Sequence, residues 1–416
     1  MKKLNRRNLF RAALGSAGAL AAQSAITPTA SAQYAKTKPI DDMRLTDYRP
    51  KQMLVVPQTR VLKAKYPVID MHTHVSHTFT RQPTPGEALQ GATPEARIKQ
   101  IVQWMDELNI KRMVNLTGGF GADLDKTMDM LVKAYPGRFV TCTVPTYKRF
   151  NEAGYPQWQA EELARAKKQG AVGLKILKTL GMYLREGGFK FNEREEGQEG
   201  PLVKIDDKRL FPMWKAAGDL KMPVFIHISD VDAFFTKYDK YNERWEEMLQ
   251  HPEVHFVGTD VPTKQELHAA RNRVIAAHPN THFVCLHVAT HPENLDDVTE
   301  FLNTYPNTTV EFSASLNDLG RQPRRARRFI EEFQDRVMFG TDASPNGLNH
   351  PQQDLEPEMY RCYFRWLETE DEHFDYSSAK FPPQGFWRIY GIGLPDEILK
   401  KIYHNNAARI MGWDPI

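Results

Sequence analysis

The chain has 416 residues, of which 41% are hydrophobic and 26% are charged, a composition that supplies a sizeable globular core and excludes a disordered or collagen-like protein. Five of its 55 basic residues lie among the first 11 residues, where no acidic residue occurs, and the remaining 50 basic side chains are matched by 52 acidic ones. A body so close to neutral gives no electrostatic basis for binding nucleic acid or an anionic membrane. The three cysteines form no CxxC pair, which indicates neither a disulfide framework nor a thiolate zinc site.

The N-terminal segment has the features of an export signal. Arg6 and Arg7 are followed by the apolar stretch 12–22 and by the small-residue run Ala-Ser-Ala at 30–32. This pattern resembles a twin-arginine signal peptide, which implies that residues 1–32 direct export through the twin-arginine machinery to the periplasm or another exported location. The apolar stretch is too short to anchor the protein in a membrane. An ordinary secretory signal or a basic tail are the alternatives.

Behind the signal, the chain changes character at residue 66. Residues 33–65 are polar, contain three prolines and predict an extended N-terminal arm. In residues 66–416, short β-rich apolar runs alternate with amphipathic segments. The predicted strands are residues 67–71, 112–116, 139–144, 172–177, 223–228, 283–288, 309–313 and 337–340. The predicted helices are residues 95–108, 124–134, 158–168, 208–220, 264–277, 294–304 and 324–333.

This alternation predicts an α/β protein whose eight strands close into a (β/α)8 TIM barrel. A doubly wound open sheet would also alternate strands and helices, but no glycine-rich dinucleotide turn follows the first strand. Long loops are expected after strands 4, 5 and 8, at residues 178–205, 229–262 and 343–395. Because these loops all follow strands, we expect them at the barrel face where active sites lie.

The first predicted strand ends in a His-x-His pair, His72 and His74. Side chains two residues apart on a strand point to the same side, so both imidazoles can face the barrel axis and bind one cation. Alone, the pair is weak evidence, because two solvated histidines at a strand end would look the same.

Three further strands end in residues that bind metals. His227 ends strand five, His287 ends strand six and Asp342 follows strand eight. Such groups at the ends of apolar parallel strands are costly to bury unless they are paired or bound to a metal. They converge only if the sheet closes, so the barrel and the metal site support each other.

These residues resemble the amidohydrolase superfamily, and residues 404–412 resemble the C-terminal helix of its amidohydrolase-related branch, which includes aminocarboxymuconate-semialdehyde decarboxylase and related hydrolases. The resemblance implies that His72, His74, His227 and Asp342 bind one divalent ion, with zinc expected. It also implies that His287 orients or deprotonates a catalytic water and that Asp342 passes the proton on.

Lys175, on predicted strand four, departs from this single-metal pattern. Other branches of the superfamily have a carboxylated lysine at this point, bridging two metals. Lys175 is therefore open to three interpretations: a carboxylated bridge between two ions, a substrate-binding ammonium group, or a structural partner of Asp342 or Glu311.

The loop after His227 supplies further candidates for substrate binding. Asp230 and Arg244 lie there among aromatic residues, and an arginine at a barrel mouth can bind a carboxylate. A structural role in a capped helix is the alternative for Arg244.

The sequence therefore predicts a metal-dependent hydrolase that cleaves an ester, lactone or amide bond of a small molecule, expected to be carboxylated or cyclic. The first alternative is a lyase on the same scaffold, a non-oxidative decarboxylase or a hydratase. The second is a non-catalytic periplasmic binding protein, which the complete set of metal ligands disfavours. Both a monomer and a homo-oligomer remain open.

Overall fold

The computed structural model describes residues 43–44, 47–48, 50–81, 92–187, 200–345, 353–377 and 384–416. The predicted signal peptide lies outside them. The chain forms two compact units, Met1–Met53 and Leu54–Ile416. In the first, Arg44 pairs with Asp47 at 2.7 Å. Among the described residues, no helix is both long and apolar enough to span a bilayer.

The second unit contains eight parallel strands in the order of the chain, three in one run of hydrogen-bonded pairs and five in another. Single bridges join the two runs, one between Thr143 and Leu174 and one between Thr73 and Ala343, so the strands close into the predicted barrel. The strands are β1 (Val68–Thr73), β2 (Ile110–Asn115), β3 (Phe139–Thr141), β4 (Leu174–Ile176), β5 (Val224–Ile226), β6 (Phe283–Cys285), β7 (Thr308–Glu311) and β8 (Val337–Met338).

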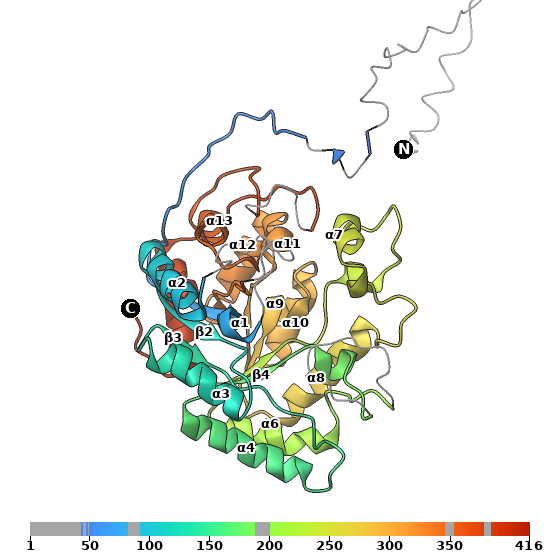
Figure 1. Ribbon diagram of the computed structural model, residues 1–416. Helices are drawn as coiled ribbons and strands as arrows, with labels where there is room; N and C mark the ends of the chain where they lie inside the picture. The colour runs from blue at the N-terminus through green and yellow to red at the C-terminus, as the bar shows by residue number, and fades with distance from the viewer. Residues whose placement is uncertain are drawn as a thin grey trace, which may run out of the picture. The chain divides into compact units, whose positions relative to one another are not determined.

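Helices surround these strands (Figure 1). Those on the outside of the barrel are α2 (Pro94–Leu108), α3 (Ala122–Thr127) with the π-helix η3 (Met128–Lys133), α4 (Tyr155–Gln169), the 3-10 helix η4 (Lys208–Leu210) with α6 (Phe211–Asp219), α8 (Lys264–Ala277), α10 (Leu295–Thr304), α12 (Pro323–Glu332) and α13 (Pro357–Glu368). Shorter segments are α1 (His77–Thr80), α5 (Thr179–Met182), η5 (Asp232–Phe235), α7 (Trp245–Gln250), η6 (Pro252–Val254), α9 (Leu286–Thr290), α11 (Leu316–Gly320), α14 (Asp396–Lys400), η9 (Lys401–Asn405) and α15 (Asn406–Met411).

Helix α2 shows how the local sequence sets these elements. It begins after Thr93, whose side chain accepts a hydrogen bond from the backbone of Ala96, and it has a proline at its first position. It ends at Asn109, which has a left-handed backbone (φ 63°), a conformation that asparagine tolerates better than most residues. Its apolar face, which includes Ile101 and Met105, is buried, and burying each such side chain stabilises the fold by roughly 1.5–3 kcal/mol.

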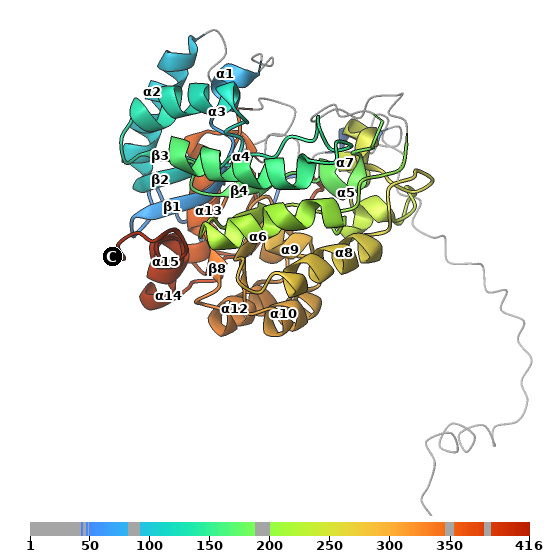
Figure 2. The ribbon, with the colours of Figure 1, turned by 90° about the horizontal axis from the view of Figure 1, so that it is seen from below.

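The interior of the barrel is filled by apolar side chains from the strands. Met71, Phe225 and Met338 belong to this cluster, together with Ala407 and Ala408 of α15. Helix α15 also contacts β1 and β8, on the side of the molecule where α14 lies (Figure 2). Asn406 donates hydrogen bonds to the carbonyls of Gln334 and Val337, which fixes this helix beneath the start of β8.

The segments expected as long loops contain helices. The segment after β4 includes α5, that after β5 includes α7, and that after β8 includes α13, where the sequence predicted no helix. Helix α13 buries Tyr360, Phe364 and Trp366 against the core, so it completes the outer ring of the barrel. Six of the strands are shorter than predicted, whereas β1 and β2 are each one residue longer. Residues 286–288, expected at the end of the sixth strand, form part of α9 instead.

Candidate metal centre

A cavity of about 280 Å³ opens at the carboxyl ends of the strands. Its walls are residues that follow β4 to β8, which is the face where (β/α)8 enzymes place their active sites. The lining residues used below are Lys178, His227, Asp230, Arg244, Glu247, His287, Asp342 and Gln353.

His72 lies in strand β1 and His74 directly follows it. The strand is buried along its whole length, and the buried carboxylate of Asp70 holds its C-terminal end in place. Asp70 accepts hydrogen bonds from the backbone N–H of His72 (3.1 Å), the hydroxyl of Thr341 (2.6 Å) and the hydroxyl of Tyr360 (2.8 Å). Burial raises the pKa of Asp70 to about 7, against the effect of these donors. Asp70 thus ties the end of β1 to the chain after β8.

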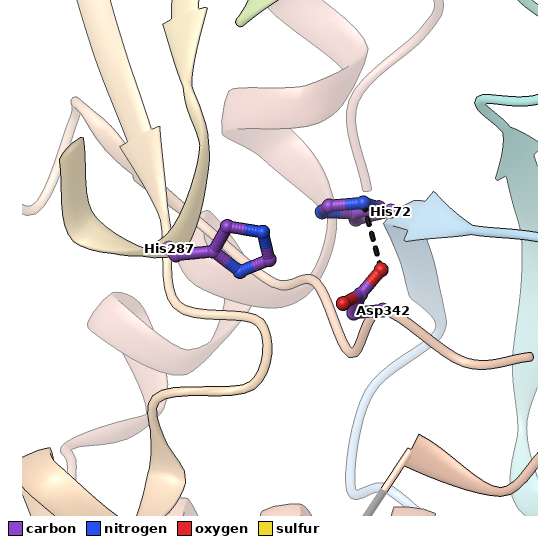
Figure 3. A group of neighbouring side chains, drawn as sticks. All are labelled: His72, His287 and Asp342. Carbon is purple, nitrogen blue, oxygen red and sulfur yellow. Dashed lines mark ion pairs between the residues drawn. The ribbon is translucent and has the colours of Figure 1, made fainter. Parts of the chain in front are cut away.

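Asp342 brings the two histidines together. Its Oδ1 lies 2.9 Å from Nε2 of His72 and 2.8 Å from Nε2 of His74. Asp342 has a left-handed backbone (φ 65°), and Gln353 donates a hydrogen bond to its other oxygen. One ligand atom each from His72, His287 and Asp342 lie within 4.8 Å of one another, and Figure 3 shows the two imidazoles and the carboxylate facing a common space. Imidazole nitrogens and carboxylate oxygens are among the donor atoms that zinc binds.

Glu311, at the end of β7, is a functional candidate that the sequence indicated only as a partner of Lys175. Its buried carboxylate lies 3.2 Å from Nδ1 of His72 and accepts the backbone N–H of His287 at 3.0 Å. Its hydrogen bond with His72 is the largest cause that lowers its pKa, to about 2, against the effect of burial. A carboxylate at Nδ1 holds the proton there and leaves Nε2 free to bind a metal. The signal that identifies it is the one used for the other strands, an acidic residue at the end of a buried strand.

His227 and His287 face each other through unprotonated ring nitrogen atoms. Nε2 of His227 lies 3.0 Å from the carbonyl of Ser229, and Nδ1 of His287 lies 2.9 Å from the carbonyl of Ser313, so each of these nitrogens must carry the ring proton. The other two nitrogens, Nδ1 of His227 and Nε2 of His287, lie 3.3 Å apart. Burial lowers the pKa of both rings, that of His227 to about 3, so no extra proton lies between them. Nδ1 of His227 is therefore available to bind a cation, and Nε2 of His287 is available to accept a proton.

The backbone at His287 is strained. Residues 287–290 all have a positive φ, between 54° and 60°, which non-glycine residues rarely adopt and which costs of order 1–3 kcal/mol each. This left-handed turn is why the sixth strand ends earlier than predicted. It turns the chain so that the backbone N–H of His287 reaches Glu311 while the ring reaches His227.

Lys175 lies on β4, next to His72. It is buried, with Nζ 3.5 Å from Nε2 of His72, and burial lowers its pKa to about 8. An ammonium group so close to a ligand nitrogen opposes a cation, whereas a neutral amine or its carbamate does not.

The two predicted substrate-binding residues line the cavity but are already paired. Asp230 accepts two hydrogen bonds from Lys178, at 2.7 and 2.9 Å, and the neighbouring cation keeps the pKa of Asp230 below its usual range. Arg244 donates to Glu247 at 2.8 Å and to Asp318 at 2.6 Å. The alternative of a structural pairing for Arg244 therefore has direct support, and its role towards substrate stays a prediction.

A family model described as amidohydrolase matches residues 69–413 of the chain. The chain belongs to the amidohydrolase family. Amidohydrolases are enzymes that generally use a divalent metal. The clustered imidazole and carboxylate groups of this amidohydrolase fit such an ion. Among proteins of curated function, none matches the sequence.

Solved structures of low sequence identity resemble this amidohydrolase. One is a putative amidohydrolase from Staphylococcus aureus, with 15% identity, a TM-score of 0.48, and coverage of 83% of this chain and 99% of the other. Another is 2,6-dihydroxybenzoate decarboxylase from Rhizobium, with 14% identity, a TM-score of 0.46 and the same coverage. A third is a probable 2-pyrone-4,6-dicarboxylic acid hydrolase from Acinetobacter baumannii, with 15% identity, a TM-score of 0.44 and the same coverage.

Proposed function

We propose that this protein is a metal-dependent hydrolase that cleaves an ester, lactone or amide bond of a small molecule. The observation that carries the proposal is the convergence of Nε2 of His72 and Nε2 of His74 on Oδ1 of Asp342, next to the cavity. His72, His74, His227 and Asp342 would hold the ion, and zinc suits this set of imidazole and carboxylate donors. A divalent ion bound there supplies Lewis acidity towards water and a carbonyl group.

His287 is the group that accepts the proton from the attacking water. Its Nδ1 is committed to the carbonyl of Ser313, so its Nε2 is unprotonated and borders the cavity. Burial lowers the pKa of His287, so the ring is neutral and ready to accept a proton near neutral pH. Asp342 is less suited to this first step, because one oxygen faces the two histidines and Gln353 donates to the other. It remains the candidate for passing the proton to the leaving group.

A product assay tests this function. Zinc-loaded protein is incubated with a panel of aryl esters, lactones and anilides, and with a panel of aromatic carboxylates, while acid release and carbon dioxide release are measured in parallel. We expect cleavage in the first panel, and we expect His287→Gln to lose most of the turnover while it still binds substrate. Release of carbon dioxide without any cleavage would identify a lyase and contradict the proposal. Binding without turnover in either panel would favour a binding protein.

We also propose that the protein is exported through the twin-arginine pathway. The support is the pair Arg6 and Arg7, followed by the apolar stretch and by the Ala-Ser-Ala run at 30–32. Replacing both arginines by lysine keeps the charge but removes the guanidinium groups, so the precursor should accumulate in the cytoplasm. Undiminished export of the double variant, followed by cell fractionation, would contradict this route.

A further inference from the structure

A second group of metal-binding side chains comes from α8, from α10 and from the residue that follows α9. His268, His291 and Asp297 each offer one ligand atom, and these three atoms lie within 4.8 Å of one another, the same limit that the candidate metal centre meets. Both histidines are half-buried, and their ring centroids are 5.7 Å apart. Two imidazoles and a carboxylate, with water in a fourth position, form a ligand set that zinc accepts.

His291 is oriented as a metal ligand usually is. Its Nε2 lies 3.4 Å from Oδ2 of Asp232, and its Nδ1 lies 2.7 Å from Oδ2 of Asp297. With the ring proton on Nε2, Asp232 holds the ring and Nδ1 is left for an ion that Asp297 can also bind. Against the effect of burial, the hydrogen bond with Asp232 raises the pKa of His291, so an ion at Nδ1 displaces a proton. The side chain of Asp297 is 50% exposed, which gives an ion access from solvent.

His268 can offer an unprotonated nitrogen. The hydroxyl of Thr290 donates to the carbonyl of Ala289 at 2.7 Å, so its oxygen accepts from Nε2 of His268 at 3.0 Å. This tautomer leaves Nδ1 without a proton. Burial, and then the charge of Arg271, keeps the pKa of His268 well below its ordinary value, so the ring is neutral. A neutral imidazole is the form that binds metals.

A neighbouring group is already neutralised. Asp232, His291 and Glu293 also offer ligand atoms within 4.8 Å of one another. However, Nζ of Lys264 lies 2.7 Å from Oδ1 of Asp232 and 2.8 Å from Oε1 of Glu293. Repulsion by this ammonium group opposes a second cation between the two carboxylates. The group that includes Asp297 is therefore the better candidate.

We propose that His268, His291 and Asp297 bind a divalent transition-metal ion, with zinc as the expected occupant, in addition to the ion at the candidate metal centre. His291 directly follows residues 287–290, the strained turn that carries His287. An ion bound at the end of this turn ties it to α8 and α10, so its role is structural. With three protein ligands, one of them half-exposed, this ion binds less tightly than an ion with four, and dialysis against metal-free buffer removes it.

Calorimetric titration with zinc tests the proposal, and it does not depend on which reaction the protein catalyses. Dialysed full-length protein is titrated with zinc chloride and, in parallel, with magnesium chloride. We expect one zinc ion per chain beyond the ion that resists dialysis, and no magnesium at this site, because imidazole suits zinc whereas magnesium prefers oxygen ligands. Amide hydrogen exchange in residues 287–291 should become slower when this zinc binds.

Variants assign the additional ion to its ligands. His268→Gln and His291→Gln should each weaken its binding by about 100-fold or more, since loss of a ligand costs more than loss of a group that only orients one. Asp297→Asn, a change at a half-exposed side chain that the fold tolerates, should also weaken it. His255→Gln changes a histidine of the loop after β5 that lies outside the group, so it should bind zinc as the wild type does.

Three results would overturn the proposal. They are the absence of any zinc beyond the ion that resists dialysis, an additional ion that both histidine variants keep, and binding of magnesium as tight as that of zinc. Zinc binding that leaves hydrogen exchange in residues 287–291 unchanged would refute the structural role of the ion.

Discussion

Oε1 of Glu311 lies 3.2 Å from Nδ1 of His72, and both side chains are buried. The contact fixes the orientation and the tautomer of a histidine whose Nε2 faces Asp342. Glu311 also accepts the backbone N–H of His287. One carboxylate on β7 therefore positions side chains that come from β1 and from the turn after β6.

Glu311→Gln should weaken metal binding without unfolding the protein. The amide keeps the size of the side chain but loses the charge that favours the proton on Nδ1 of His72. We expect a loss of about 10–100-fold in zinc affinity, measured by competition with a chromophoric chelator. Glu300→Gln, an exposed change on α10, is the matched control. Equal zinc affinity in the two variants would show that Glu311 has no role in positioning His72.

The pair His227 and His287 should respond differently to substitution. His227→Ala removes a proposed ligand and should lose both metal and activity, as should His72→Ala. His287→Ala removes a base and should keep one ion per chain while turnover falls by about 10²–10⁴-fold. Metal content by elemental analysis and kcat are measured on the same preparations. Loss of the ion from the His287 variant would make His287 a ligand and refute the single-metal assignment.

Lys175 decides between one ion and two. If it is unmodified, as we expect, Lys175→Met should keep one ion per chain, because the ammonium contributes no ligand atom. A carbamate at this position would instead bridge a second ion about 4 Å from the first, and the substitution would then empty both sites. Metal counts are taken with and without added bicarbonate. Two ions in the wild-type protein, both lost in the variant, would favour the bridged centre.

Tyr360→Phe should destabilise the barrel at its closure. The substitution removes the hydroxyl that donates to Oδ2 of Asp70 and leaves this fully buried oxygen with one donor fewer. We expect a loss of about 1–3 kcal/mol in the free energy of unfolding, measured with urea. Tyr305→Phe, whose ring packs against Phe301 outside the strands, is the control. A cost no larger than that of the control would show that the hydroxyl is not needed.

Much of the fold could be predicted because local patterns carry it. All eight strands lie where apolar β-rich runs occur, and the helix predicted at 264–277 has the bounds of α8, whose Thr263 and Glu266 form a reciprocal cap. Helix α13 was not predicted because its buried residues are mostly aromatic, and a segment rich in aromatic residues after a strand was interpreted as a long loop. The bounds of β6 were wrong because left-handed backbone in residues 287–290 is a tertiary property that no local propensity indicates.

The candidate site could be predicted from the sequence only where metal-binding residue types stand at the ends of apolar strands. Histidines and an aspartate at strand ends indicated a metal, and the structure brings His72, His287 and Asp342 together. The role of Glu311 was not predicted because it depends on contacts with His72 and with the backbone of His287, which only the fold brings together.

The metal content of the purified full-length protein tests the central claim most directly. After dialysis against metal-free buffer, elemental analysis should find one tightly bound divalent ion per chain, predominantly zinc, and none in His72→Ala. A folded wild-type protein that holds no divalent ion, and whose activity is unchanged by a chelator, would contradict the account.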